Sequence, residues 1–148
     1  MATLAVNKRA NFDYEILERY EAGLALFGHE VKSVKLGHIS LKESFVTIKG
    51  QELYLTNAHI TPYKQAGHIP DYEPTRPRKL LLKRAQIAHL IGKSRTEGLT
   101  LVPVRVYTKK RYVKLEFGVG KGKKKFDKRE TIKKREDERG MRRTIKNF

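Results

Sequence analysis

The sequence predicts a mainly β protein, a small closed or partly open antiparallel barrel with two or three short helices and a basic C-terminal tail. Three observations predict it. Segments with alternating apolar residues recur at hairpin spacing, the helical patterns between them are short, and the last 31 residues are rich in lysine and arginine. With 148 residues, 39% of them hydrophobic, the chain can bury one modest core.

The first part of the chain predicts a long strand followed by a short helix. Residues 12–26 alternate apolar and polar side chains, which favours a strand, and Gly23 is a likely bend within it. Residues 30–36 place Val31 and Val34 three apart, and Gly37 can end that helix.

A hairpin and a long loop come next. Residues 45–48 and 53–60 are predicted strands, and residues 49–52 have the composition of the turn between them. Four of the five prolines then fall within residues 62–77, which predicts an irregular surface loop.

The next segment is ambiguous at its start. The leucines of residues 80–82 suit either a buried strand or a first helical turn, because three residues are too few to show a period. Residues 83–91 predict a helix with one apolar side, formed by Ile87, Leu90 and Ile91, and Gly92 is expected to stop it.

Residues 99–107 and 112–119 predict a second hairpin. Apolar residues are expected to face each other across it from one side of the sheet: Val102, Val104 and Val106 on one strand, and Val113, Leu115, Phe117 and Val119 on the other. Five or six strands in consecutive hairpins, with short helices as plugs, favour a partly open Greek-key barrel of the oligonucleotide-binding type.

The composition divides the chain at residue 118. Residues 1–117 have 20 basic and 11 acidic residues, a net charge of +9, and form the predicted barrel. Residues 118–148 have 13 basic and five acidic residues, a net charge of +8, and few large apolar side chains. We expect this tail to be disordered when free, because it cannot offset the ~1–2 kcal/mol per residue that backbone ordering costs. The apolar spacing of Met141, Ile145 and Phe148 predicts that the tail becomes helical once it binds a partner.

The formal net charge of +17 predicts a polyanionic partner. Lysines and arginines that neutralise phosphates release condensed counterions, so nucleic acid is favoured over a membrane surface or a merely solubilising charge. Residues 1–6 are too short an apolar run for a signal peptide, and no apolar stretch approaches the ~20 residues of a membrane span. We therefore expect a soluble cytoplasmic protein without a membrane partner.

No motif of catalysis or metal binding stands out. Cysteine is absent, and the five histidines lack metal-ligand spacing, so we expect no metal site and no cofactor. Residues 118–123 are glycine-rich and basic but lack the spacing of a phosphate-binding loop. We expect the protein not to be an enzyme.

Five segments, in order, resemble the SsrA-binding protein family, also called small protein B. Together they span nearly the whole chain, and their order and spacing are more specific than any one of them. The segments are Asn7–Ala10, Glu21–Ser33, Asn57–Tyr63, Arg76–Leu82 and Gly122–Glu130.

The resemblance implies a function in ribosome rescue. The barrel would bind the tRNA-like domain of transfer-messenger RNA, and the tail would occupy the empty messenger channel and decoding centre of the small ribosomal subunit during trans-translation. Alanyl-tRNA synthetase and elongation factor Tu would act on the same RNA, and no cofactor is implied. The alternatives are a structural ribosomal protein, another translation factor that binds ribosomal RNA, or an RNA-processing enzyme.

The resemblance assigns RNA binding to four positions, Asn7, Glu21, Leu81 and Lys114. A carboxylate such as Glu21 can accept a hydrogen bond from a base edge, but it also suits an ordinary strand surface. Lys114 alternates away from its apolar neighbours and should face outward toward a phosphate. Leu81 on sequence alone favours the core over an interface, and Asn7 could simply cap a turn.

Aromatic residues offer stacking on unpaired RNA bases. Tyr63 and Tyr72 in the proline-rich loop are the best-placed candidates, although loop tyrosines often only pin the loop.

In the tail, Asp127, Lys128 and Arg129 match the segment that the family uses in the decoding centre. Many relatives have His or Tyr before that aspartate, where this chain has Phe126, so a ring remains for stacking but a side-chain hydrogen bond does not. Phe126 could instead pack on the rim of the barrel.

Overall fold

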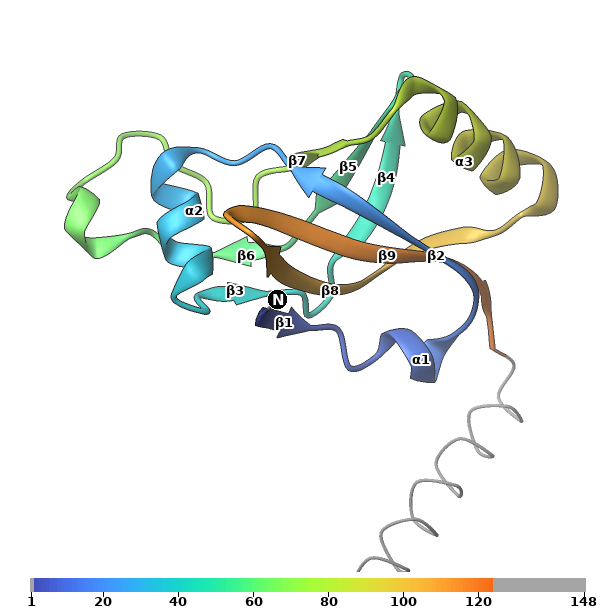
Figure 1. Cartoon of the computed structure of the whole chain (residues 1–148), viewed down its shortest axis with the longest axis horizontal. Coiled ribbons are helices and arrows are strands. Elements are labelled where there is room, and N and C mark those ends of the chain that lie inside the picture. The colour runs from blue at the N-terminus through green and yellow to red at the C-terminus, as the bar shows by residue number, and fades with distance from the viewer. Residues whose placement is uncertain (1, 124–148) are drawn as a thin grey trace, which may run out of the picture.

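The computed structural model describes residues 2–123. Within that range the chain forms nine strands, three α-helices and one short 3-10 helix (Figure 1). The strands are β1 (Ala2–Val6), β2 (Tyr14–Leu24), β3 (Ile39–Ser40), β4 (Phe45–Lys49), β5 (Glu52–Thr56), β6 (His59–Ile60), β7 (Arg78–Leu81), β8 (Thr100–Lys109) and β9 (Tyr112–Gly122). The helices are α1 (Ala10–Asp13), α2 (Gly28–Lys35), η1 (Lys64–Ala66) and α3 (Arg84–Glu97).

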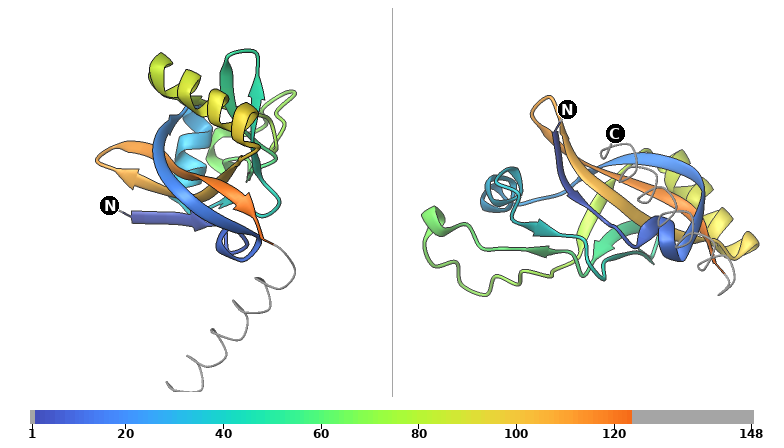
Figure 2. Two further views of the ribbon diagram at one scale, coloured as in Figure 1. Left: turned by 90° about the vertical axis from the view of Figure 1, so that its right-hand side faces the viewer. Right: turned by 90° about the horizontal axis from the view of Figure 1, so that it is seen from below.

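Seven strands form one antiparallel sheet in the order β1-β8-β9-β2-β7-β5-β4. The sheet curls so that β4 lies against β8, but these two strands do not pair within residues 2–123. The barrel is therefore partly open. Strands β3 and β6 form a separate pair. Helices α2 and α3 lie at opposite ends of the molecule (Figures 1 and 2). The predicted mainly β, partly open barrel of the oligonucleotide-binding type is confirmed.

The β8–β9 hairpin is at its predicted place, but the prediction that its three valines share one side is wrong. Val106 lies in the main core with Leu115 and Phe117, whereas Val102 and Val104 form a second small core with Ala10. The cause is a register shift between Pro103 and Arg105, because an extra residue in one strand turns the following side chains to the other face.

Two predicted strands are shorter than expected. Phe12 lies in α1, so β2 begins only at Tyr14. The predicted strand of residues 53–60 is broken at Asn57, whose φ of 64° is left-handed, and it continues as β6. Strand β1, which the sequence analysis did not assign, pairs with β8 at the edge of the sheet.

Helix α3 is longer than predicted, while the ambiguous leucine segment is a strand. Gly92 does not stop α3, which ends before Gly98 in the left-handed conformation (φ 64°). Its predicted apolar side is confirmed, since Ile87 and Leu90 are buried and Ile91 packs against the core. The leucines of residues 80 and 81 lie in β7.

The glycine-rich segment after Phe117 is part of β9, which runs to Gly122, so the sheet includes residues 118–122 of the predicted tail. A Cβ atom on Gly118 would lie 2.5 Å from Cγ2 of Ile16, and one on Gly120 would lie 3.3 Å from Cδ1 of the same residue. These glycines therefore allow β2 and β9 to approach closely where the register of β2 shifts, between Ile16 and Glu18.

A buried polar cluster joins α2, the proline-rich loop and β7. Arg78 and Glu30 are both fully buried, with Arg78 Nη2 2.5 Å from Glu30 Oε2, and Arg78 also donates to the Ala58 carbonyl at 2.6 Å. Arg76 donates to the other carboxylate oxygen, and the Tyr72 hydroxyl lies 3.1 Å from Glu30 Oε2. Burial opposes ionisation of Glu30, but hydrogen bonds from Arg76, the Phe27 backbone and Arg78 outweigh it and lower the pKa of the carboxyl.

Candidate nucleic-acid interface

Three of the predicted RNA-binding residues meet on the outer face of the sheet although they are far apart in sequence. Gly23 of β2 pairs with Lys114 of β9 on one side and with Leu81 of β7 on the other. Glu21 lies two residues before Gly23 and so projects from the same face. Glu21, Leu81 and Lys114 line one open hollow of about 600 Å³, which we call the β2 surface.

Leu81 is on this surface, not in the core that sequence reasoning favoured. Its neighbour Leu80 is fully buried, so alternation along β7 turns Leu81 outward, where it is 52% exposed. The side chain lies over Gly23, because a Cβ atom there would be 3.3 Å from Leu81 Cβ. Gly23 is therefore a paired strand residue that makes room for Leu81, and the bend predicted at it is wrong.

Glu21 is held by two residues of β8. The Tyr107 hydroxyl donates to Oε2, and Lys109 Nζ lies 3.5 Å from Oε1. The hydrogen bond from Tyr107, with the positive charge of Lys109, lowers the pKa of Glu21, while burial and the carboxylate raise the pKa of Tyr107. The carboxylate is therefore ionised and oriented near neutral pH, and two oxygens offer about four acceptor sites in all.

A second glutamate stands directly across from Glu21, and other residues neutralise it. Glu116 of β9 pairs in register with Glu21, an arrangement of like charges that would destabilise the sheet without partners. Arg105 Nε lies 2.6 Å from one Glu116 oxygen and Arg19 Nη1 lies 2.8 Å from the other. Burial opposes ionisation of Glu116, but these two arginines outweigh it and lower its pKa.

Lys114 faces outward as predicted, and it has an aromatic neighbour that the sequence analysis missed. Its Nζ lies 5.9 Å from the centre of the Tyr112 ring. Tyr112 is 60% exposed, at the start of β9. The signal that could have revealed it is the i, i+2 spacing, which places both residues on one face of the strand. The surface therefore combines a carboxylate, an apolar side chain, a cation and an exposed ring.

The other two predicted RNA-binding residues of the barrel, Asn7 and Tyr63, lie outside the β2 surface. Asn7 uses its side chain within the fold: Nδ2 donates to the Pro103 carbonyl at 2.8 Å, and Oδ1 accepts from the Arg9 backbone at 3.2 Å. It fixes the turn between β1 and α1, as the turn-capping alternative predicted. Tyr63 lies beside α2, with Lys32 Nζ 5.7 Å from its ring centre.

The interpretation of Tyr72 as an outward stacking residue is wrong. Its hydroxyl joins the buried cluster, where it accepts from Arg78 Nη2 at 3.2 Å, and its ring contacts His29 edge-on at 4.9 Å between centres. This tyrosine pins the proline-rich loop, which was the alternative.

The four tail candidates, Phe126, Asp127, Lys128 and Arg129, lie outside the described residues. Over residues 2–123 there is no group of three or more histidine and carboxylate side chains that could hold a metal ion. No helix in that same range has the length and apolar character needed to cross a membrane.

Comparisons with known proteins agree over almost the whole chain. The SsrA-binding proteins of Trichodesmium erythraeum and Streptococcus mutans are 49% and 50% identical over 142 and 145 residues, which cover 96% and 98% of this chain and 91% and 93% of theirs. That of Carboxydothermus hydrogenoformans is 49% identical over 143 residues, 97% of this chain and 95% of its own.

A solved structure described as "tmRNA-SmpB: a journey to the center of the bacterial ribosome" aligns with a TM-score of 0.65 at 46% identity, covering 81% of this chain and 84% of the other. The family model described as SmpB protein matches residues 4–147. The resemblance seen in the five sequence segments is thereby confirmed, and the chain belongs to the SmpB protein family.

Proposed function

We propose that this chain binds the tRNA-like domain of transfer-messenger RNA and delivers that RNA to stalled ribosomes for trans-translation. The observation that carries the proposal is the convergence of Glu21, Leu81 and Lys114 on one open surface. Relatives half identical to this chain are SsrA-binding proteins, and an aligned structure is described as a complex of the RNA with the family's protein at the ribosome.

The β2 surface suits recognition of a folded RNA better than generic phosphate binding. Lys114 can meet a phosphate, and Glu21 can accept from a base amino group or a ribose hydroxyl, which a purely electrostatic binder has no use for. Tyr112 and Leu81 offer a ring and an apolar contact to unstacked bases, as RNA loops require. Asn7 would act by fixing the turn that presents Lys8 and Arg9, and Tyr63 would contact RNA from the α2 end.

The part of the predicted tail that follows β9, residues 123–148, would act in the empty messenger channel and decoding centre of the small subunit. Phe126 would stack on a ribosomal RNA base, and Lys128 and Arg129 would meet phosphates beside it. Asp127 would orient Arg129 or cap a helix that forms on binding. Alanyl-tRNA synthetase and elongation factor Tu would be partners only through the same RNA, and the protein would work in the cytoplasm, where ribosomes are.

Sequencing the RNA recovered with a tagged chain tests the binding part of the proposal. We expect transfer-messenger RNA to be strongly enriched and ribosomal subunits to be substoichiometric. Stoichiometric recovery with one subunit, without transfer-messenger RNA, would instead identify a structural ribosomal protein.

Peptide tagging on stalled ribosomes tests the tail. Phe126→Ala and the double variant Lys128→Ala/Arg129→Ala should bind transfer-messenger RNA normally but fail to tag, while Phe126→Tyr should retain most tagging because the ring remains. Normal tagging by Phe126→Ala, with a lower melting temperature, would show that the ring packs on the barrel rim.

A further inference from the structure

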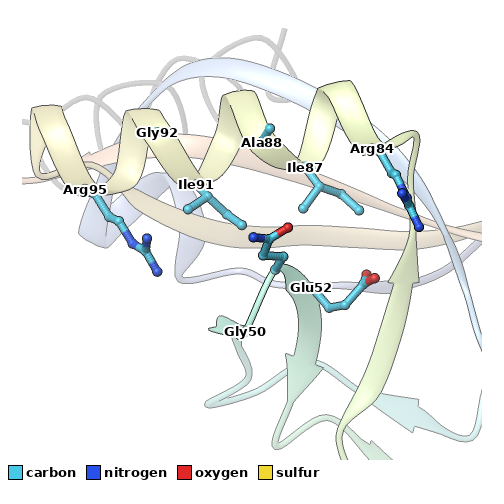
Figure 3. Close-up of a pocket in the computed structure, with 9 residues that line it drawn as sticks. Gly50, Glu52, Arg84, Ile87, Ala88, Ile91, Gly92 and Arg95 are labelled. Carbon is cyan, nitrogen blue, oxygen red and sulfur yellow. The ribbon is translucent and has the colours of Figure 1, made fainter.

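A groove runs beneath α3, next to the β2 surface. It has a volume of about 580 Å³, within the ~300–1,000 Å³ range of small-ligand sites, and lies between α3 and the β4–β5 turn at Gly50. Ile87 and Ile91 point from the helix toward that turn, with Arg84 and Arg95 toward the two ends (Figure 3). We call this the α3 groove.

The two arginines give the α3 groove an unneutralised positive charge. Both are exposed, and neither side chain has an ion pair or a hydrogen bond to another residue in the range 2–123. They are eleven positions apart, which is ~16 Å along a helix at 1.5 Å per residue. Guanidinium groups spaced in this way on either side of an apolar floor suit a short polyanion with flat apolar units, which describes single-stranded RNA.

One oxygen of the Glu52 carboxylate, which lines the groove, lacks a hydrogen-bond donor. Glu52 Oε1 lies 3.5 Å from Lys79 Nζ, which offsets the charge of the carboxylate. Glu52 Oε2 is itself buried and has no hydrogen-bond partner in the described part of the chain, while the side chain as a whole is 38% exposed, so a rotation of the carboxylate brings this oxygen to the groove. Buried carboxylate oxygens rarely remain unbonded, and the amino groups of bases and the ribose hydroxyl are the donors that RNA would bring.

The α3 groove is continuous with the β2 surface. Glu52, Arg84 and Ile87 line both hollows, and residues 82–83 connect β7 directly to α3. We propose that the α3 groove binds a short unpaired segment of the transfer-messenger RNA whose tRNA-like domain occupies the β2 surface. Arg84 and Arg95 contact its phosphates, a base lies on Ile91 beside the nearly buried Ile87, and Glu52 accepts from that nucleotide. This inference rests on the proposed function.

The chain's own tail is a poor occupant by comparison. Residues 123–148, which follow β9, have 12 basic and five acidic residues, a net charge of +7, so two unpaired arginines would repel them. An acidic peptide would also satisfy the arginines, and its backbone N–H groups could donate to Glu52 Oε2. The RNA is favoured over it because the α3 groove is continuous with the β2 surface.

Photo-crosslinking identifies the occupant directly. A photoreactive benzoylphenylalanine replaces Gln51, an exposed residue of the groove, in the full chain bound to full-length transfer-messenger RNA on ribosomes. We expect a crosslink to an unpaired nucleotide of that RNA, and none from the same probe at Lys35, on α2 at the far end of the molecule. Crosslinks only to ribosomal RNA or to protein would overturn the proposal.

Binding of the double variant Arg84→Ala/Arg95→Ala supplies the second measurement. Affinity for transfer-messenger RNA should fall about tenfold, and the slope of log affinity against log salt should flatten by about two. The matched control is Lys35→Ala/Lys42→Ala, which removes the same charge at two exposed lysines that line neither the α3 groove nor the β2 surface, and it should change affinity less than about threefold. An equal loss in both double variants would mean that only net charge matters and would overturn the inference.

The same assay separates this inference from the function on which it rests. If Glu21→Ala/Lys114→Ala binds weakly while Arg84→Ala/Arg95→Ala binds normally, the α3 groove proposal alone fails. If both double variants bind as tightly as the unaltered chain, the proposed function fails with it.

Discussion

The buried Glu30 cluster and the β2 surface are both built around a glutamate, yet the two carboxylates are used in opposite ways. Glu30 has no exposed surface, and arginines, a tyrosine and a backbone amide surround it. Glu21 has one hydroxyl and one distant ammonium as partners, and its side chain is 37% exposed. The Glu30 carboxylate therefore stabilises the fold, whereas the Glu21 carboxylate has acceptor sites that a ligand can reach.

Strand β7 contributes to both regions and shows how the difference arises. Its inward positions hold Arg78 and Leu80 and its outward positions hold Lys79 and Leu81. A charged residue is thus buried and a leucine exposed, against the usual preference of each. Arg78 is accommodated because Glu30 and the Ala58 carbonyl satisfy it, whereas Leu81 lies over Gly23 and leaves about half of its surface exposed.

The largest expected effect comes from breaking the buried cluster. Glu30→Ala leaves Arg78 buried without its counter-charge, so the free energy of unfolding should fall by ~3–5 kcal/mol. Urea unfolding measures this loss, with Glu21→Ala as the control, which should change stability by less than ~1 kcal/mol. A loss below ~1 kcal/mol for Glu30→Ala would show that the cluster is not a stabilising unit.

The lowered pKa of Glu30 predicts how the cluster responds to acid. A group whose pKa is lower in the folded state stabilises the fold above its unfolded pKa, ~4.3 for glutamate, and loses that contribution as pH falls through the folded value. Stability should therefore fall below about pH 4.3. Glu30→Gln should be less stable than the unaltered chain at neutral pH, with the difference shrinking in acid. A difference that is constant from pH 7 to acid would contradict the ion pair.

Removing the exposed carboxylate should affect RNA and not the fold. Glu21→Ala should weaken binding of the tRNA-like domain by ~1.5–3 kcal/mol if the carboxylate accepts one hydrogen bond from the RNA. Counterion release alone predicts the reverse sign, because the variant is more positive. Tyr107→Phe, which keeps the acid but removes one bond that orients it, should cause a smaller loss in the same binding assay. Tighter binding by Glu21→Ala would remove Glu21 from the interface.

Tyr112 should contribute to binding through its ring. A tyrosine that is 60% exposed on the same face as Lys114 can stack on an unpaired base, a contact that contributes ~1–3 kcal/mol. Tyr112→Ala should lose an amount at the lower end of that range, and Tyr112→Phe should bind as the unaltered chain does. Equal losses in both variants would assign the effect to the hydroxyl instead.

The sequence predicted the class of fold because alternation within each strand is local information. It missed the boundaries where tertiary contacts override local pattern. Gly92 has the composition of a helix end but lies inside α3, and Asn57 interrupts an apolar run that reads as one strand. The two faces of β8 could not be separated either, because a one-residue register shift leaves no mark in the hydrophobic pattern.

Only part of the candidate interface could likewise be predicted from local sequence pattern. The alternation of apolar and polar residues along β9 correctly predicted that Lys114 faces outward. The same pattern could have predicted that Tyr112 lies beside it. It could not bring Glu21, Leu81 and Lys114 together, since that needs the pairing of β2 with both β7 and β9. Nor could it separate Tyr72, which is held in the buried cluster, from Tyr63, because both lie in one proline-rich loop.

The smallest expected effect concerns Lys114 and is best seen in salt dependence. One phosphate contact changes the slope of log affinity against log salt by about one, so Lys114→Ala should flatten the slope by that amount. Lys35→Ala on α2 removes the same charge far from the β2 surface and should leave the slope unchanged. If both variants flatten the slope equally, the affinity for RNA depends only on the overall charge of the protein. The β2 surface would then not be the place where the RNA binds. If only Lys114→Ala flattens the slope, the cation lies against a phosphate, next to the base edge that Glu21 accepts from.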